Sequence, residues 1–176
     1  MSNYLELKVP VSWNAEWFAQ LRQRMAEENI SVRWQKRYYH ITAAFIYNDE
    51  PVEELTKVFD TMFTRRKAPK LTLDTLDAFC AKEAPVIIVN LTSSHPSPDF
   101  NILVNQLSES AREQGANIDG KFLLHITLGR IDIAKTSIEQ VRGIVSGIEV
   151  PSFTLQLKEA EYRYYRGDSI RCWTLE

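Results

Sequence analysis

The sequence predicts an α+β fold in which mainly antiparallel sheets are flanked by helices. Short segments with alternating or continuous apolar residues are typical of strands, and longer segments with an apolar residue every three or four positions are typical of helices. The connections between these segments are short, and the last one has the residues of a hairpin turn. We therefore expect one domain, or one compact body made of two lobes, over residues 1–176.

The N-terminal elements follow from local patterning. The alternating residues 5–9 predict a first strand, and a helix follows it with Asn14 as its N-cap, because apolar residues then recur at helical spacing. A short strand at 32–34 and a long strand at 38–47 come next.

The middle of the chain begins with the turn residues 48–51, which end the long strand and start a helix that runs to about Thr64. Residues 71–74 alternate as a strand does. Residues 86–91 form a nearly continuous apolar run, which is typical of a strand buried on both faces.

The C-terminal half repeats this mixture. A helix begins near 97–99 and ends at Gly115, a strand covers 122–131, and a helix covers 134–146. Three strands near 151–157, 160–165 and 169–175 complete the chain, and the last two form a hairpin that turns at 166–168.

Two of the three histidines lie in the same tripeptide, His40-Ile41-Thr42 and His125-Ile126-Thr127, each within a predicted strand. In a strand, residues i and i+2 point to the same face, so each tripeptide presents an imidazole and a hydroxyl together while its isoleucine points to the core. The two motifs lie 85 residues apart, and each is followed by a helix, which suggests a crude internal repeat.

Paired histidines suit acid and base roles in a displacement at phosphorus, because one imidazole can be neutral while the other is protonated near neutral pH. Thr42 and Thr127 can donate hydrogen bonds to the non-bridging phosphate oxygens. Arg130 lies five residues beyond His125 and is the candidate cation for binding the same phosphate.

Further candidate substrate contacts lie around the first motif. Lys36 and Arg37 precede it with no acidic neighbour, and they could bind phosphate or form a solvated face. Tyr39 and Phe45 are among the aromatic residues that could stack on a base or belong to the core.

Other classes of protein have less support. A metal centre lacks a third ligand, since His95 lies in a predicted loop, and no Gly-x-Ser-x-Gly nucleophile elbow occurs. We expect Cys80 and Cys172 to be reduced structural thiols. A formal charge of −2 argues against binding nucleic acid chiefly through a basic surface. No apolar segment approaches bilayer length and no leader is evident, so we expect a cytoplasmic protein without membrane contact.

The extended motifs at 39–43 and 124–130 resemble the two His-x-Thr motifs of the 2H phosphoesterase superfamily, particularly its LigT-like branch of RNA 2′,3′-cyclic phosphodiesterases and 2′-5′ RNA ligases. Residues 71–79 and 157–173 look like the segment between the motifs and the closing hairpin of that family. The resemblance implies a bilobal LigT-like fold whose two pseudo-symmetric halves each contribute one motif to a central cleft. It also implies no metal and no nucleotide cofactor. We expect the protein to be a monomer.

By this resemblance, His40 and His125 are the catalytic pair, and Thr42 and Thr127 bind phosphate. The first-motif histidine is expected to be the base when a 2′,3′-cyclic phosphate opens to a 2′-phosphate, and the second to be the acid. The expected partners are RNA ends or nucleotides with a 2′,3′-cyclic phosphate or a 2′-5′ linkage. The alternative is a module that binds a nucleotide or RNA end in the same cleft without turning it over.

Overall fold

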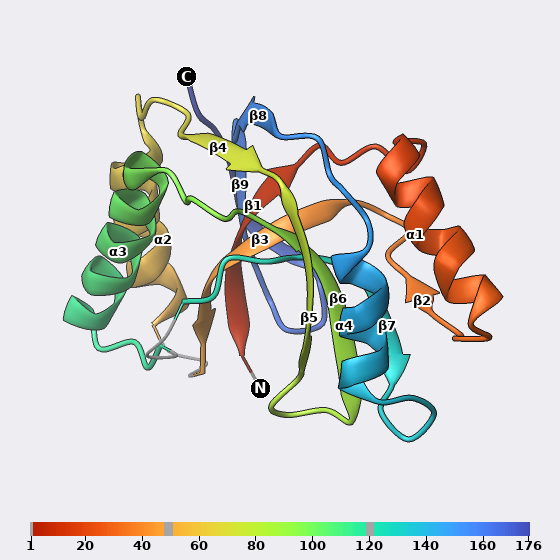
Figure 1. Cartoon of the computed structure of the whole chain (residues 1–176). Helices are drawn as coiled ribbons and strands as arrows, with labels where there is room; N and C mark the ends of the chain where they lie inside the picture. Colours follow the sequence, from red (N-terminus) through yellow and green to blue (C-terminus); the bar gives the residue numbers. More distant parts are fainter. Residues whose placement is uncertain (1, 48–50, 119–121) are drawn as a thin grey trace.

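The computed structural model describes residues 2–47, 51–118 and 122–176. Within these residues the chain forms four helices and antiparallel sheets, so the predicted α+β class is confirmed (Figure 1). The predicted turn at 48–51 lies outside the described residues except for Pro51, and the helix that follows it is present. No helix in the described part of the chain is long and apolar enough to cross a membrane.

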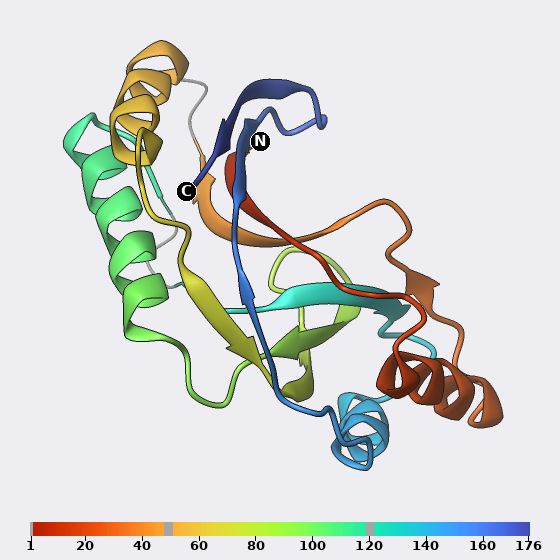
Figure 2. The same cartoon turned by 90° about the horizontal axis from the view of Figure 1, so that it is seen from above.

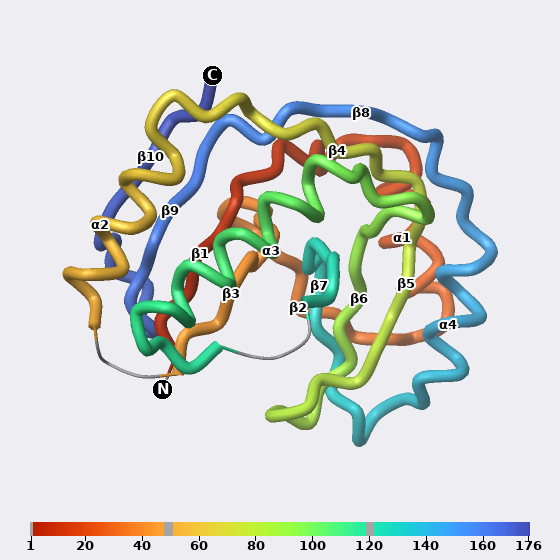
Figure 3. The backbone as a smooth tube through the Cα atoms, turned by 90° about the vertical axis from the view of Figure 1, so that its left-hand side faces the viewer, coloured from red at the N-terminus to blue at the C-terminus, as the bar shows by residue number. Residues whose placement is uncertain are grey.

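The first lobe contains a four-stranded sheet that we call sheet A. Its strands, in spatial order, are β10 (Ser169–Thr174), β9 (Glu159–Arg163), β1 (Asn3–Val9) and β3 (Tyr39–Ile46). Helices α2 (Val52–Phe63) and α3 (Pro98–Glu113) cover one face and lie in front of this sheet in Figure 3. The alternate residues Leu5 and Leu7 are fully buried in the core, as the alternating pattern predicts.

The second lobe contains a matching sheet, sheet B. Its strands, in spatial order, are β2 (Arg33–Trp34), β7 (Ile126–Asp132), β6 (Val86–Thr92) and β5 (Thr75–Cys80). Helices α4 (Ile138–Ser146) and α1 (Glu16–Glu27) pack together, and α4 contacts β5 (Figure 2). Each sheet is therefore associated with two helices.

A two-stranded sheet runs between the lobes. Strand β4 (Lys70–Leu73) leads from α2 of the first lobe to β5 of the second, and β8 (Phe153–Gln156) leads from α4 back to β9. The two strands pair antiparallel, so these two passages of the chain between the lobes run side by side. The predicted hairpin is also present, and Gly167 occupies its turn with a φ of 97°, a backbone conformation that favours glycine.

Several predicted boundaries were wrong. The residue that caps α1 is Ala15 rather than Asn14, with no side-chain hydrogen bond. Helix α4 begins at Ile138 instead of 134, because the Ser137 hydroxyl accepts a hydrogen bond from the Gln140 backbone N–H and caps it there. The strand predicted for 122–131 begins only at Ile126. No strand was predicted between Asp74 and residue 86, whereas β5 covers Thr75–Cys80.

Candidate active site

The first motif lies on β3, an edge strand of sheet A. His40 is directly opposite Lys8 of β1, and Thr42 is opposite Glu6. Residues that are opposite one another in an antiparallel pair share a face, so these four side chains lie on one face, which we call the motif face of sheet A. Ile41 points to the other face and is fully buried.

The second motif lies at the start of β7 in sheet B. His125 immediately precedes the strand, so the prediction that it lies within a strand was wrong. Its ring is fixed by other means: Nδ1 lies 2.9 Å from the Leu123 carbonyl oxygen, and the edge of the Phe79 ring contacts it at 5.1 Å between centroids. A carbonyl only accepts, so Nδ1 carries the proton in the neutral ring and Nε2 keeps a free lone pair.

Each motif strand contains a β-bulge just after its threonine. In the first, Glu6 pairs with Thr42 but Leu5 pairs with Ala44, so Ala43 is the extra residue. In the second, Asn90 pairs with Thr127 but Val89 pairs with Gly129, so the extra residue is one position beyond the threonine again. A one-residue insertion shifts the alternation of side chains between the two faces of a strand. The residue three positions after each threonine therefore lies on the same face of its sheet as that threonine.

This shift places Arg130 beside Thr127. Arg130 is opposite Ile88, which is two residues from Asn90 on β6 and thus on the same face. Its Nη1 donates a hydrogen bond to Gln35 Oε1 at 3.3 Å. Burial lowers the pKa of Arg130 and the neighbouring Arg33 lowers it further, so this guanidinium would gain from an anionic ligand.

The other predicted contacts are distributed differently. Phe45 is opposite Tyr4 on the motif face and 40% exposed, because of the bulge. Tyr39 lies on the opposite face, where its ring packs against Phe18 at 6.2 Å, so the structure does not bring it to the motif face. Lys36 and Arg37 are exposed in the segment between β2 and β3.

The two motifs come together where the sheets meet. Strands β3 and β7 contact each other. Burial is the main cause that lowers the pKa of His40, and the positive charges of Arg130 and His125 contribute to the same shift. Residues of the second motif therefore lie within electrostatic reach of the first histidine.

The electrostatics of the two imidazoles differ in one respect. Burial lowers the pKa of both rings below the ordinary value. The carboxylate of Glu6 opposes this shift at His40, whereas the Leu123 carbonyl opposes it at His125. The first histidine thus has a charged partner and the second has a neutral one.

Residues that the motif analysis did not select form a charged cluster on the motif face of sheet A. Glu6 and Glu161 are buried there and bind Lys8 at 2.5 and 2.8 Å, respectively. Arg163 contacts both carboxylates, and Tyr38 donates a hydrogen bond to Glu6 at 2.9 Å. In the sequence, Glu6 and Lys8 alternate with apolar residues, which places them on one face of the strand. This pattern alone is typical of a solvated strand face, so it did not identify the cluster.

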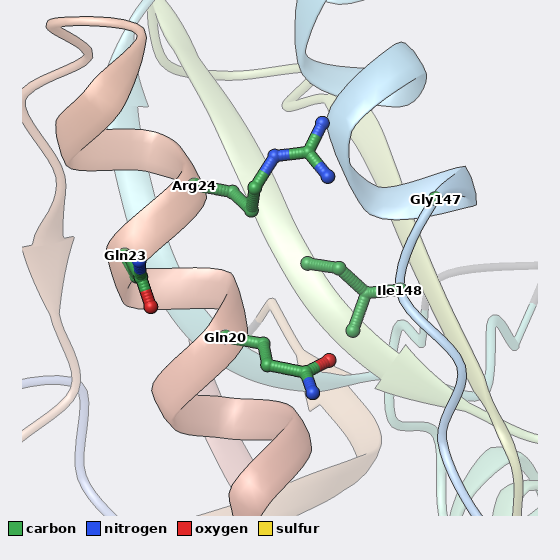
Figure 4. Close-up of a pocket in the computed structure, with 5 residues that line it drawn as sticks. All are labelled: Gln20, Gln23, Arg24, Gly147 and Ile148. Atoms are coloured by element: carbon green, nitrogen blue, oxygen red, sulfur yellow. The ribbon is translucent and has the colours of Figure 1, made fainter.

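Among the described residues, no three His, Cys, Asp or Glu side chains gather in a way that could hold a metal ion. Both Cys80 and Cys172 are exposed and form no disulfide. A hollow of about 150 Å³ lies between α1 and the segment after α4 (Figure 4). Its lining is Gln20, Gln23, Arg24, Gly147 and Ile148, none of which belongs to either motif.

Solved structures of known proteins match this chain over nearly its whole length. Escherichia coli LigT with bound NADP⁺ is 19% identical with a TM-score of 0.58, and the match covers 99% of each chain. Usb1 from Kluyveromyces marxianus is 10% identical with a TM-score of 0.67, covering 99% of this chain and 98% of Usb1. The chain has the LigT-like fold. The predicted bilobal architecture of that fold is thus confirmed.

A third solved structure also matches the chain over nearly its whole length. The MHV ns2 PDE domain is 13% identical with a TM-score of 0.58, and the match covers 97% of this chain and 99% of that domain. No protein-family model matches the sequence, and no curated protein matches it. At sequence identities below 20%, these similarities establish the fold alone. The activity must be inferred from the site.

Proposed function

We propose that the protein is a metal-independent phosphoesterase of the 2H type that opens 2′,3′-cyclic phosphates, or cleaves or forms 2′-5′ linkages, in RNA or small nucleotides. The observation that carries this proposal is the doubled motif with its doubled bulge. The first half supplies His40, Thr42 and Phe45 to one face of sheet A, and the second supplies Thr127 and Arg130 to one face of sheet B with His125 immediately before the strand. These groups match the needs of an in-line displacement at phosphorus.

In the proposed hydrolysis, His40 takes a proton from the attacking water and the water oxygen forms a bond to phosphorus. The bond from phosphorus to the ribose 3′ oxygen breaks, and His125 gives its proton to that oxygen, leaving a 2′-phosphate. Thr42, Thr127 and Arg130 donate hydrogen bonds to the non-bridging oxygens, whose negative charge grows in the transition state. Each proton transfer of this kind contributes about 10²- to 10⁴-fold to the rate.

The ligands recorded in similar structures agree with this substrate class. Crystal structures of Escherichia coli LigT contain 3′-AMP or phosphate, and a structure of Kluyveromyces marxianus Usb1 contains uridine monophosphate. These are properties of those proteins. They support a nucleotide or an RNA end as the first substrate to test.

The deciding experiment measures turnover of a 2′,3′-cyclic nucleotide by the wild type and by the His40→Ala and His125→Ala variants, with and without a chelator. We expect each variant to lose activity by about 10²-fold or more, and the chelator to have no effect. Unchanged turnover in either variant would refute the paired roles, and loss with chelator would refute metal independence. Tight nucleotide binding without product, over long incubation, would indicate a binding module instead.

A further inference from the structure

Glu6 is a fully buried carboxylate on the motif face, and it has no role in the reaction proposed above. It is 0% exposed and lies opposite Thr42, next to His40. Its Oε2 lies 3.6 Å from Nε2 of His40 and has no hydrogen-bond partner. A buried carboxylate oxygen without a partner is costly, so this arrangement calls for an explanation.

The other oxygen of Glu6 is held firmly. Oε1 accepts hydrogen bonds from Lys8 Nζ at 2.5 Å, from the Tyr38 hydroxyl at 2.9 Å and from Arg163 Nη1 at 3.5 Å. Lys8 and Arg163 also contact Glu161, which lies on the neighbouring strand β9. Three donors on one oxygen fix the direction of the carboxylate and leave Oε2 directed at the imidazole.

His40 lacks the anchor that His125 has. Nδ1 of His125 is bonded to the Leu123 carbonyl, which fixes that ring. Nδ1 of His40 is buried with no hydrogen-bond partner. The rings of Tyr4 and Tyr38 flank His40 at 6.5 and 5.5 Å between centroids, but rings do not select a protonation state as a carboxylate does.

We propose that Glu6 is a positioning residue for His40: it orients the imidazole and stabilises its protonated form after the ring has taken the proton of the attacking group. This inference rests on the proposed function. In this step the O–H bond of the attacking group breaks, an N–H bond forms at His40, and the positive charge lies beside Oε2. The separation of 3.6 Å is longer than a hydrogen bond but within the range of an ion pair, so a proton on Nε2 would lie beside the carboxylate.

The remaining charges around His40 make such a partner necessary. Lys8 on β1, together with Arg130 and His125 of the second motif, disfavours a positive charge on this ring, and so does burial. Glu6 is the group facing the ring that acts in the opposite sense. Without it, a protonated His40 would lie among positive charges in a partly buried site.

The test is an NMR titration of the histidine side chains in the full chain, compared among the wild type, Glu6→Gln and Glu161→Gln. Glu161 is the matched control, because it is 7% exposed and binds the same Lys8 and Arg163, yet it has no contact with His40 in the described structure. We expect Glu6→Gln to lower the pKa of His40 by about one unit or more and to leave that of His125 nearly unchanged. Glu161→Gln should shift the pKa of His40 much less.

Activity provides the second measurement. For Glu6→Gln we expect kcat for a 2′,3′-cyclic nucleotide to fall by about ten- to a hundredfold with little change in KM, and for Glu161→Gln a change of about twofold or less. An unshifted pKa of His40 in Glu6→Gln, or equal effects of the two variants, would overturn the inference. If Glu6→Gln does not fold, the electroneutral variant Glu6→Gln/Lys8→Met takes its place. Loss of Lys8 raises the pKa of His40 and loss of Glu6 lowers it, and because Glu6 is the larger influence we expect the same direction with a smaller shift.

These results separate the inference from the proposed function. The titration needs no turnover, so it tests Glu6 even if no substrate is found. Conversely, inactivity of His40→Ala with an unshifted pKa of His40 in Glu6→Gln would keep the phosphoesterase and remove only the role of Glu6.

Discussion

Phe45 and Arg130 occupy equivalent places in the two halves of the molecule. Each lies three residues after a motif threonine, beyond a one-residue bulge, and on the face that carries its motif. The two strands thus share a local backbone irregularity as well as a tripeptide. The bulge replaces the residue expected from alternation, Ala44 in the first strand, by one with a larger or charged side chain.

The position of Phe45 predicts a role in binding. We expect Phe45→Ala to raise KM for a nucleotide substrate by about tenfold with little change in kcat, because stacking of a base on an aromatic ring contributes about 1–3 kcal/mol. The control is Ile102→Ala, which removes an apolar side chain that is 52% exposed on α3. Steady-state kinetics on a cyclic nucleotide would measure both, and equal KM values would contradict the prediction.

The position of Arg130 predicts a role in both binding and turnover. We expect Arg130→Ala to lower kcat/KM by about a hundredfold, and Arg130→Lys to restore part of the loss, because lysine keeps the charge but lacks the planar pair of donors. Lys57→Ala is a suitable control, since it removes one positive charge from an exposed helical ion pair with Glu53. Wild-type kinetics in Arg130→Ala would remove this residue from the site.

Most of the secondary structure could be predicted because its causes are local. The alternation at 5–9 and the helical stripe that starts at Trp17 depend on neighbouring residues, and β1 and α1 appear where they were expected. The bulges could not be predicted, because the extra residue exists only relative to a partner strand. Alternation alone would have placed Arg130 on the face opposite Thr127.

The sequence indicated the motif residues of the candidate site, but not the charged residues that surround them. The two tripeptides were evident, whereas Glu6 was not, since a charged residue that alternates with leucines is typical of a solvated strand face. Its burial depends on Tyr38 and on Arg163, which is 157 residues away in the chain. Contacts of this range require the fold to be known.

The sheet that carries the second motif offers a test of packing. A Cβ added at Gly129 would lie 2.5 Å from Cγ1 of Val32 and 3.0 Å from the Trp34 ring, since Trp34 of β2 pairs directly with Gly129 and Val32 immediately precedes β2. We expect Gly129→Ala to lower the free energy of unfolding by about 1–3 kcal/mol, measured by urea denaturation. Gly129→Ala/Val32→Ala should recover part of the loss, because it removes the nearest atom.

A matched glycine lies in α4. A Cβ at Gly143 would meet no atom within 4 Å, so Gly143→Ala should raise the free energy of unfolding by about 0.5–1 kcal/mol through helix propensity. Opposite signs for the two glycine-to-alanine changes are the expected result. A destabilisation of similar size at both positions would show that the close approach of β2 is not the cause.

The lowered pKa values of both motif histidines predict how stability depends on pH. Because the folded pKa lies below the unfolded value of about 6.5 in each case, the unfolded chain binds more protons as the pH falls through that value. The free energy of unfolding should therefore fall from about pH 7 downward, until the pH passes below the folded pKa values. Urea denaturation at a series of pH values, in the wild type and in His40→Gln/His125→Gln, measures this. We expect a shallower loss between about pH 7 and 5 in the variant, with a difference on the order of 1 kcal/mol, and parallel curves would contradict the burial of the two rings.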